Sequence, residues 1–542
     1  MSSVTGIFST NSNVINNEEL IWLLYSCNIL QDHRGQAGAG VVTANPKRIK
    51  GPIKDRGPAR SSTPLSALKN LSDHTTFAGL GHTCYAKDRF LRREDIHPVR
   101  VHSDNYEIYV SSDGILLDKQ NRCQTLKDYG YKVESNTNGA IIGTTFARYL
   151  DETGDEFEAG HRVIDGNYGS GVFSTVMLVR RKSDGKTKIV AIKDKRANKP
   201  MCYGERNDTM FVASETYPLQ NFGIMEVGDK GIRRVKGGDV IVFSENGIDA
   251  KNYGDSKLEM PCVFGPVYFG GPEALMLESI GPMFAELAKR LGRNPEAVPS
   301  NYTIRNCLGL SWYDRWKNEI EMPDLVSPVV DSGTGVTNGI AAGLEITADK
   351  YIGTLIKTLA YRTFQLSNPE ERWLEVMLKL KLLTDILKGR NLLIGDDSIV
   401  RGGVSGLSVY EDKGEMQFFP RKNYGAIGQL KNIGGVESIM MAISYAPMFF
   451  QCFHEFNTME SRAARDSIGG SLIEIGDEVA GRLEPDRGER SILEVRYNPL
   501  DNVYGVCGKG KCAACANGCY PVDDQFIPDR IKERQDRFVE SK

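Results

Sequence analysis

The sequence lacks the features that would send a chain into or across a membrane. Its first residues, MSSVTGIF, contain no basic stretch and no long apolar run, so they do not resemble a signal peptide. The most apolar window, Ser438–Phe453, is interrupted by Ser444 and Pro447 and is too short to span a bilayer. Internal repeats and low-complexity tracts are also missing. We therefore expect a soluble, cytoplasmic protein without a membrane partner.

An excess of positive charge is lacking as well. The formal net charge of the 542 residues is −3, so the charge predicts no basic face for nucleic acid. With 40% hydrophobic and 25% charged residues, the composition is that of a globular protein. A chain of this length is expected to fold as about two to four domains, each with its own core.

Cysteine is present, but without the context that disulfides need. There are eleven cysteines and no secretory signal, so a disulfide framework is not expected. Four of the eleven lie within Cys507–Cys519. Clustered thiols in an intracellular chain indicate metal or redox chemistry.

The first 250 residues alternate between short β-like runs and amphipathic segments, and the turn-rich stretch Asn246–Pro261 ends this pattern. The pattern predicts a sheet-rich domain, α/β or with αββα layers. The runs and segments include Val41–Val42, Tyr106–Ser111, Gly171–Val179, Lys188–Ile192, Thr209–Ala213, Asp239–Phe243, Glu18–Leu30 and Gly139–Tyr149.

The second region has longer elements. Helices are predicted over Pro272–Leu291 and Pro369–Leu387, and buried strands over Leu325–Val330 and Asn391–Ile394. Strands that alternate with helices indicate a parallel sheet, whose ligand loops gather at the carboxyl ends of the strands. The loops DSGTG and DDSIVRGG follow the two strands, so they can converge on one ligand.

The most informative stretch is NLLIGDDSIVRGGVS, residues 391–405, in which Asp396 and Asp397 follow the second of these strands. In α/β proteins such carboxylates bind ribose hydroxyls or Mg²⁺, and backbone N–H groups of the next loop bind a phosphate. An ordinary strand with an acidic turn is the alternative, and the added SIVRG makes it the less favoured one. The stretch resembles the 5-phosphoribosyl-1-pyrophosphate (PRPP) signature of type I phosphoribosyltransferases.

Eight motifs, in order, extend this resemblance over nearly the whole chain. They are HRGQAGAG (33–40), GHTCYA (81–86), ASETYPL (213–219), CVFGPVYFGGPEA (262–274), VVDSGTGVTNGIA (329–341), LIKTLAYRTF (355–364), DDSIVRGGVS (396–405) and CAACANGCYP (512–521). On these motifs the chain resembles the glutamine PRPP amidotransferases (amidophosphoribosyltransferases) of purine synthesis. In that family, one domain hydrolyses glutamine, and the ammonia displaces pyrophosphate at C1 of PRPP in the other.

The resemblance implies an α/β fold class with two known domain types. An α+β four-layer domain of the N-terminal-nucleophile glutaminase type is expected over 1–255. A type I phosphoribosyltransferase domain with a parallel sheet is expected over 256–445, and a C-terminal helical segment with the Cys cluster over 446–542. The family also implies a homo-oligomer, either a dimer or a tetramer.

Four positions of the glutaminase motifs depart from the family. Thr5 stands at the position of the Cys nucleophile, and MSSV precedes it, so its amine becomes a free base only if Met1–Val4 are removed. Cys84 replaces an Arg that holds the glutamine carboxylate, and Asn136 replaces an acid that pairs with its amine. Asp113 replaces an oxyanion-hole Asn, whose loss alone costs about 10²–10³ in rate. We expect no glutaminase activity.

The transferase motifs are better preserved. By resemblance, Asp396 and Asp397 bind the ribose hydroxyls and Mg²⁺. Gly403 and Val404 replace a Thr pair of the family and Gly271 replaces an Arg, and each lost hydrogen bond to phosphate costs about 1.5–3 kcal/mol. The other implied ligand residues are Ser398, Ile399, Val400, Arg401, Gly402 and Gly403 for the 5′-phosphate, Asp331, Ser332 and Gly333 for pyrophosphate, and Lys357 and Arg362 in a loop that closes over PRPP.

One branch of the family carries a structural 4Fe–4S cluster. Counterparts of its four ligands are present as Cys262, Cys452, Cys512 and Cys515. A zinc ion on the same four ligands is the alternative. A further alternative is that these cysteines are buried and bind no metal, but that alternative explains the CxxC spacing poorly.

Three functions fit the sequence. The first is an amidophosphoribosyltransferase-like enzyme that uses free ammonia or ammonia from a partner glutaminase. The second is a non-catalytic paralogue that binds phosphoribosyl ligands, nucleotides or a protein partner in a regulatory or redox-sensing role. The third is a transferase with another amine acceptor. Pyrophosphate release from PRPP with ammonium discriminates among them.

Overall fold

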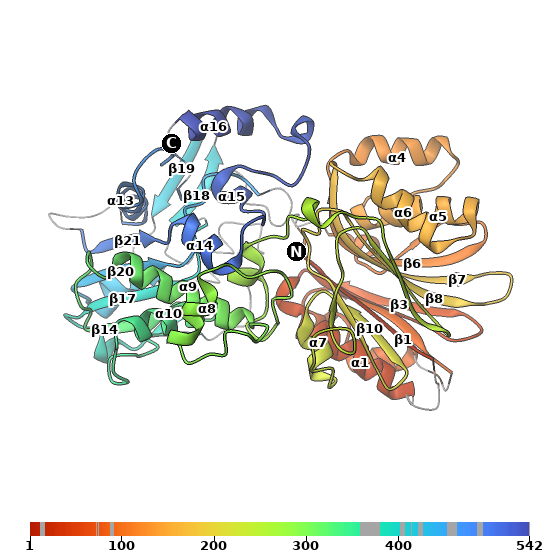
Figure 1. Ribbon diagram of the computed structural model, residues 1–542, viewed down its shortest axis with the longest axis horizontal. Coiled ribbons are helices and arrows are strands. Elements are labelled where there is room, and N and C mark those ends of the chain that lie inside the picture. The colour runs from red at the N-terminus through yellow and green to blue at the C-terminus, as the bar shows by residue number, and fades with distance from the viewer. Residues whose placement is uncertain are drawn as a thin grey trace. The chain divides into compact units, whose positions relative to one another are not determined.

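The computed structural model describes residues 1–10, 17–71, 73, 75–86, 91–357, 380–400, 407–412, 415–420, 426–452, 463–464, 466–484 and 491–540. The chain divides into two compact units (Figure 1). The first contains Met1–Cys262 and Pro521–Ile527, and the second contains Val263–Tyr520 and Pro528–Lys542. Among the helices of the described ranges, none has the length and apolar character that a membrane crossing needs.

The first unit contains two antiparallel sheets that pack face to face. The seven-stranded sheet has the order β11 (Arg233–Arg234), β9 (Cys202–Arg206), β10 (Thr209–Ala213), β1 (Ser3–Ser9), β4 (Ala78–Cys84), β2 (Gly38–Ala44) and β3 (Ile49–Arg56). The six-stranded sheet has the order β13 (Gly247–Asn252), β12 (Asp239–Ser244), β8 (Thr187–Lys193), β7 (Gly171–Arg181), β6 (Tyr106–Leu116) and β5 (Val99–Val101).

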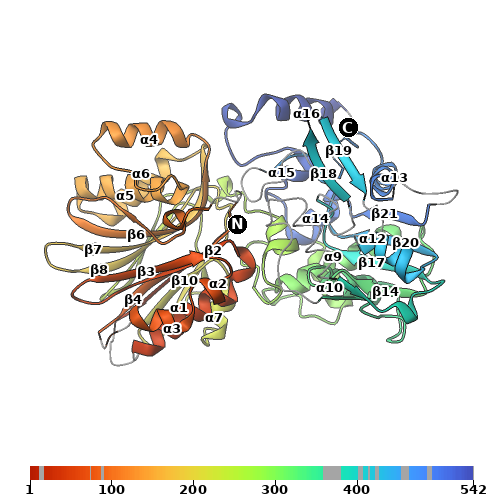
Figure 2. The ribbon, with the colours of Figure 1, turned by 180° about the vertical axis from the view of Figure 1, so that it is seen from behind.

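Helices cover the outer faces of both sheets. Helix α1 (Asn17–Leu30) lies on the seven-stranded sheet with α7 (Thr216–Asn221) and the short helices α2 (Ala59–Ser62) and α3 (Leu65–Leu68) (Figure 2). On the six-stranded sheet lie α5 (Asn138–Thr153) and α6 (Glu156–Gly166), and α4 (Lys119–Asp128) packs against α5. This is the four-layer αββα arrangement that the strand pattern favoured.

The position of β7 explains why its sequence, GVFSTVMLV, is apolar on both faces. Its first nine residues are all buried, because one face meets the other sheet and the other face meets the helices. The helices that precede it in the chain are bounded by local signals. Thr137 and Asp155 accept backbone N–H groups at the starts of α5 and α6, and Gly154, at φ 67°, ends α5.

The second unit is built on a four-stranded parallel sheet. Its order is β14 (Leu325–Pro328), β17 (Asn391–Asp396), β20 (Ser438–Ile443) and β21 (Leu493–Tyr497). Helices α9 (Asn301–Trp316), α10 (Gly333–Gly343) and α13 (Leu472–Leu483) pack against it. The indoles of Trp312 and Trp316 are buried, and their N–H groups donate to the carbonyls of Arg496 and Tyr497. These two hydrogen bonds connect α9 to β21.

Smaller elements complete the second unit. They are α8 (Phe284–Arg290), the hairpin of β15 (Leu355–Lys357) and β16 (Leu380–Leu382), the hairpin of β18 (Leu407–Asp412) and β19 (Glu415–Pro420), α12 (Ala426–Gln429), α14 (Leu500–Cys507), α15 (Ala514–Asn517) and α16 (Asp529–Glu540). Strand β21 and helices α13 to α16 all lie within residues 446–542, and β21 joins this segment to the parallel sheet.

The helix predicted over Pro272–Leu291 is wrong for most of its length, because only Phe284–Arg290 is helical. The backbone N–H groups of Gly281 and Met283 donate to the carbonyls of Val506 and Gly505 in α14, so they are not available to a helix of their own. A Cβ at position 281 would meet the Gly505 carbonyl oxygen at 2.2 Å. Contact with a distant helix therefore overrides the local apolar pattern.

The helix predicted over Pro369–Leu387 is also wrong over residues 380–387, the part of this range that the structure describes. Residues 369–379 lie outside the described residues. Leu380–Leu382 form β16, which pairs with β15 in an antiparallel hairpin, and a single 3₁₀ turn follows at Thr384–Ile386. The pairing partner lies more than twenty residues upstream, so periodicity within the segment does not reveal it.

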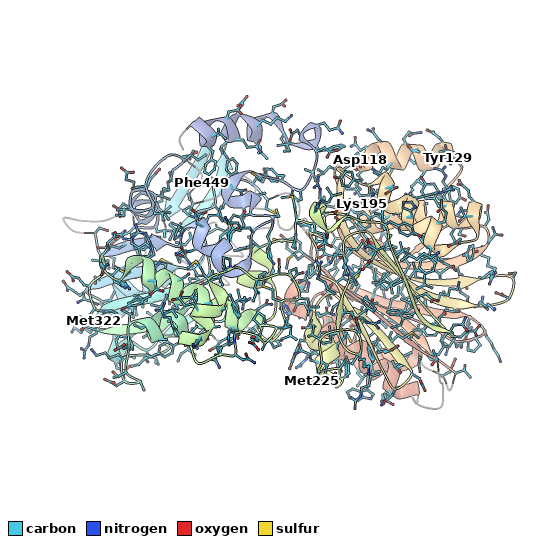
Figure 3. The ribbon with its side chains drawn as sticks, viewed as in Figure 1. Asp118, Tyr129, Lys195, Met225, Met322 and Phe449 are labelled. Atoms are coloured by element: carbon cyan, nitrogen blue, oxygen red, sulfur yellow. The ribbon has the colours of Figure 1, made fainter. Side chains whose placement is uncertain are left out.

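Exposed apolar side chains of the first unit are scattered. Tyr129 at the end of α4 and Met225 in the loop after α7 lie on opposite sides of that unit (Figure 3). Single exposed apolar residues are normal on protein surfaces and do not by themselves indicate a binding face.

Candidate functional site

The carboxyl end of β17 carries a buried pair of acids. Leu392, Leu393 and Ile394 fill the core, and the strand then delivers Asp396 and Asp397, which are 7% and 2% exposed. The register places Gly395 beside Pro328 at the end of β14. The ends of neighbouring parallel strands therefore meet at one edge of the sheet, where an α/β fold holds its ligands.

The loop after β14 converges on this pair, as the sequence pattern predicted. The Ser332 hydroxyl donates to the Asp397 carboxyl, and the Val329 N–H donates to the carbonyl of Gly395. Gly333 approaches β17 so closely that a Cβ there would lie 2.4 Å from the Gly395 oxygen. Helix α10 starts at this glycine, so its first N–H groups, which attract anions, lie at the same edge.

Burial dominates the electrostatics of the acid pair. It raises the pKa of Asp397, although the hydroxyls of Ser332 and Ser398 and the charge of Arg305 act in the opposite direction. The Asp397 N–H donates to the Asp396 carboxylate at 2.8 Å, which fixes one acid against the other. A carboxyl group whose anion is disfavoured by burial gains from a nearby cation, and Mg²⁺ is held in proteins by such carboxylates together with substrate oxygens.

Arg305 in α9 is a residue that the sequence analysis missed. It is buried, and its guanidinium donates to the carbonyls of Pro266 at 3.0 Å and Gly270 at 2.7 Å. It therefore holds the turn that contains the FGGPE sequence while its charge acts on Asp397. An arginine between the core residues Ile304 and Leu308 was the available signal, because arginine is almost never buried unless paired.

The other predicted ligand residues fall into two groups. Asp331, Ser332, Gly333, Asp396, Asp397, Ser398, Ile399 and Val400 are described, and the Val330–Asp331 peptide bond is cis. Lys357 ends β15, where its backbone pairs with Leu380. Arg362, Arg401, Gly402 and Gly403 lie outside the described residues.

The position expected for a nucleophile in the first unit is closed. Thr5 lies inside β1, where it pairs with Ala213 and Gly81 on either side, and is 1% exposed. The Gln31 side chain donates to its hydroxyl at 3.0 Å and accepts the N–H of Glu215. In this sequence Val4 precedes Thr5, so the nitrogen of Thr5 becomes the free amine base of an N-terminal nucleophile only if Met1–Val4 are removed.

Asp113, at the position expected for an oxyanion donor, is bound in a buried ion-pair network. Its carboxylate lies 3.4 Å from an Nη of Arg34 and 3.7 Å from the Nζ of Lys199. Arg34 also pairs with Glu215 at 2.8 Å, and His33 contacts the same carboxylate at 3.1 Å. Burial acts to raise the pKa of Asp113, but the neighbouring cations outweigh it and lower that pKa to about 2.

The other two altered positions also lack the chemistry of a glutamine clamp. Cys84 is buried at the end of β4, and burial raises the pKa of its thiol to about 12, so it carries no charge at neutral pH. Asn136 is exposed in the loop before α5. The sequence analysis also missed Lys199, because the residues next to it in sequence do not indicate that this lysine is buried.

Three cysteines of the second unit lie on segments that are tied together. Burial and the nearby Cys452 raise the pKa of Cys515 to about 12, and the Tyr445 hydroxyl lies 3.4 Å from its sulfur. The Phe450 N–H donates to the carbonyl of Cys515, and the N–H of Val263 donates to the carbonyl of Cys512. Val263 directly follows Cys262, which ends the first unit.

No three His, Cys, Asp or Glu side chains in the described ranges are grouped closely enough to hold a single metal ion.

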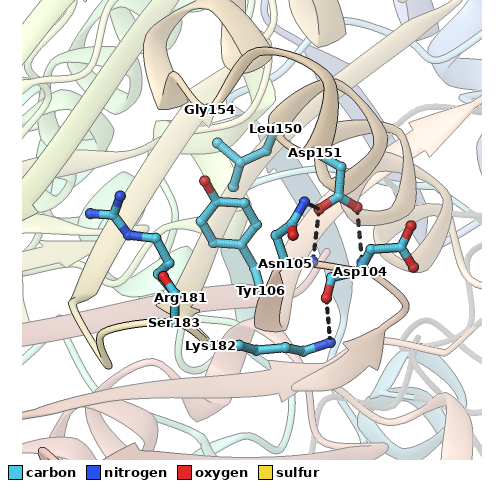
Figure 4. Close-up of a pocket in the computed structure, with 9 residues that line it drawn as sticks. All are labelled: Asp104, Asn105, Tyr106, Leu150, Asp151, Gly154, Arg181, Lys182 and Ser183. Carbon is cyan, nitrogen blue, oxygen red and sulfur yellow. Dashed lines mark hydrogen bonds between the residues drawn. The ribbon is translucent and has the colours of Figure 1, made fainter.

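A hollow of about 470 Å³ in the first unit is a weaker candidate (Figure 4). Its lining includes Asp151, which accepts hydrogen bonds from the Asn105 backbone and side chain and from the Tyr131 hydroxyl. Lys182 donates to the carbonyls of Ser103 and Asp104. The charged groups of Asp151 and Lys182 thus stabilise the turn between β5 and β6 and leave little to recognise a ligand.

No protein-family model matches the chain. The sequence is 23% identical to the amidophosphoribosyltransferase of Methanocaldococcus jannaschii over 506 residues, which cover 91% of this chain and 93% of that protein. A solved structure of the allosteric regulatory enzyme of purine biosynthesis matches with a TM-score of 0.73 at 19% identity, over 97% of each chain. The glutamine PRPP amidotransferase of B. subtilis matches with a TM-score of 0.70 at 19% identity, over 96% of this chain and 97% of that one. The predicted fold class is thereby confirmed.

Proposed function

We propose, from its full-length relatives and its fold, that this chain is an amidophosphoribosyltransferase-like enzyme of purine synthesis, which binds PRPP and transfers ammonia to C1. The relatives are amidophosphoribosyltransferases, a class of pentosyltransferases. The observation that carries the proposal is the buried pair Asp396 and Asp397, which the Ser332 loop faces at the carboxyl edge of a parallel sheet. The cytoplasmic location and the homo-oligomer stay predictions.

Each part of PRPP has a matching group at this edge. The carboxylates of Asp396 and Asp397 would bind the ribose hydroxyls and Mg²⁺, which balances the charge of the pyrophosphate. Ser332, Gly333 and the start of α10 offer a hydroxyl and N–H groups to the pyrophosphate. Ammonia forms a bond to C1, the bond from C1 to pyrophosphate breaks with its electron pair, and the attacking nitrogen loses one proton.

We also propose that the first unit releases no ammonia from glutamine. In support, the nitrogen of Thr5 lies in a peptide bond, and Asp113 is an acceptor held by Arg34 and Lys199. An acceptor at this position opposes the negative charge that develops on a carbonyl oxygen, whereas a donor would stabilise it. The ammonia therefore comes from solution or from a partner glutaminase.

Pyrophosphate release in the presence of PRPP and Mg²⁺ tests this function. With ammonium the full-length protein is expected to release pyrophosphate, and with glutamine it is expected to release no more than without an amine. Glutamate formation from glutamine would contradict the inactive first unit. Binding of PRPP without turnover under either condition would instead favour the non-catalytic paralogue.

A 4Fe–4S cluster on Cys262, Cys452, Cys512 and Cys515 is the cofactor that we propose beside Mg²⁺. Support comes from the hydrogen bond that joins the segments of Cys452 and Cys515 and from the four thiols, the number that such a cluster needs. The group would link strands and loops that are distant in sequence, and so stabilise the fold.

Iron analysis after anaerobic purification tests the cluster. We expect about four iron atoms and about four sulfide ions per chain, because a cubane cluster has that content. A Cys512→Ser variant should lose them, whereas Cys519→Ser, which alters the exposed cysteine of the same segment, should retain them. Zinc in place of iron would establish the alternative site, and a protein without either metal would refute both.

A further inference from the structure

The residues ahead of Thr5 are bound beside Asp113, the position expected for an oxyanion donor. The N–H of Ser2 donates to the Asp113 carboxylate at 3.1 Å, and the carbonyl of Ser2 accepts the Nε–H of Arg34 at 2.9 Å. The hydroxyl of Ser2 accepts the N–H of Tyr85 at 3.1 Å. Three different segments of the unit thus recognise the backbone and side chain of one residue.

Ser3 and Val4 also form hydrogen bonds with neighbouring segments. Ser3 and Val4 extend β1 along β4 opposite Thr83 and His82, and both are 0% exposed. The Ser3 and Thr83 hydroxyls hydrogen-bond at 2.7 Å. Val4 donates its N–H to the Ser214 hydroxyl and accepts the N–H of Ser214 in return. The segment therefore has the partners of a sheet strand and a side chain in the core.

The groups around Ser2 carry buried charges of both signs. Arg34 and Lys199 bring two positive charges, and Asp113 and Glu215 bring two negative ones, all buried. Residues 1–4 add hydrogen bonds to this cluster, and the amino group of Met1 adds a positive charge that helps to lower the pKa of Asp113. A free amino acid would also bring a carboxylate, and burial of that anion beside Asp113 and Glu215 is costly.

We propose that residues 1–4, the N-terminal plug, act as an intramolecular peptide ligand that permanently occupies the amino-acid pocket of the first unit and excludes free amino acids from it. Assignment of this pocket rests on the proposed function, because the resemblance places a glutamine-carboxylate position at Cys84 and the oxyanion-hole position at Asp113. A tethered ligand competes at an effective concentration in the millimolar range or above. The pocket would then contribute to the stability of the fold and would not bind a substrate.

Thiol labelling of full-length variants tests the plug. A Ser3→Cys thiol would be buried, whereas a Thr10→Cys thiol beyond the other end of β1 would be exposed. With each site followed by peptide mass spectrometry, Ser3→Cys should react at least about 100-fold more slowly, because labelling must wait for local opening. Millimolar L-glutamine should leave this rate unchanged.

Labelling of Ser3→Cys within about 10-fold of Thr10→Cys would overturn the plug, as would acceleration of labelling by glutamine. If Ser3→Cys does not fold, hydrogen exchange on the unmodified protein decides the matter. The Val4 amide should then exchange as slowly as amides in the centre of β1, and fast exchange counts against the plug. Neither measurement involves PRPP, so the plug and the proposed transferase reaction can fail independently.

Discussion

Replacement of Asp397 by asparagine is expected to lower ammonium-dependent pyrophosphate release from PRPP by about 100-fold or more. The side chain keeps its size and an oxygen that accepts from Ser332 and Ser398, but it loses the charge that we assign to Mg²⁺ and ribose binding. Each hydrogen bond to a charged group is worth about 1.5–3 kcal/mol, so the loss of two accounts for at least two decades. Steady-state pyrophosphate assays at saturating Mg²⁺ measure the effect.

The stability of the same variant separates a role in binding from a role in folding. Burial raises the pKa of Asp397, so the charged form costs free energy in the folded protein. The neutral amide of the Asp397→Asn variant removes that cost, and the melting temperature should stay equal or rise while activity falls. An Asp385→Asn variant at an exposed acid of the same unit should change neither quantity. Undiminished activity of Asp397→Asn would remove the acid pair from the proposed site.

Replacement of Arg34 by leucine is expected to destabilise the protein by about 3–5 kcal/mol. The change leaves the Asp113 and Glu215 carboxylates buried with one cationic partner fewer, and removal of one member of a buried ion pair has costs of this size. Denaturant unfolding followed by fluorescence measures the loss. Arg315→Leu, which breaks an exposed i,i+4 pair with Glu319 and a cation–π contact with Trp316, is the control and should cost about 1.5 kcal/mol or less.

The pH dependence of the Arg34→Leu effect has a definite sign. In the parent protein the pKa of Asp113 is lowered to about 2, and that of Glu215 is also lowered. The stability that these carboxylates contribute is present above their unfolded pKa values, about 4, and is lost as the pH falls through the lower folded values. The difference in the free energy of unfolding between the parent protein and the Arg34→Leu variant should therefore become smaller as the pH falls. A difference that is constant with pH would show that lost packing, not lost charge, causes the destabilisation.

The elements that the sequence predicted well have local causes. A short apolar run followed by Asp396 and Asp397 identified both the strand and the acids at its end. Alternation of strands and helices predicted the parallel sheet, and the sheet then brought the Ser332 loop to Asp397. Thr5 and Asp113 lie in β1 and β6, and their assignment to the nucleophile and oxyanion positions stays a prediction from the neighbouring motifs.

The failures involve partners that are remote in the chain. The helix predicted from Pro272 is missing because α14, more than two hundred residues later, takes the N–H groups of Gly281 and Met283. Arg305 and Lys199 were overlooked because a buried cation has meaning only through the carbonyls or carboxylates it contacts. The sequence showed MSSV ahead of Thr5, but not that Ser2 binds Asp113 and Arg34.

Local sequence by itself determined where the chemistry-bearing residues lie: acids after an apolar strand, a CxxC, and a threonine in place of a cysteine. Such features depend on residue type and spacing, which are fully present in the chain. Only the tertiary structure decided how these residues are charged and occupied. It paired Asp113 with Lys199, set Arg305 near Asp397 and bound the Ser2 N–H to Asp113. Burial and electrostatic pairing are properties of neighbours in space, and for these residues the neighbours lie tens of residues or more apart in sequence.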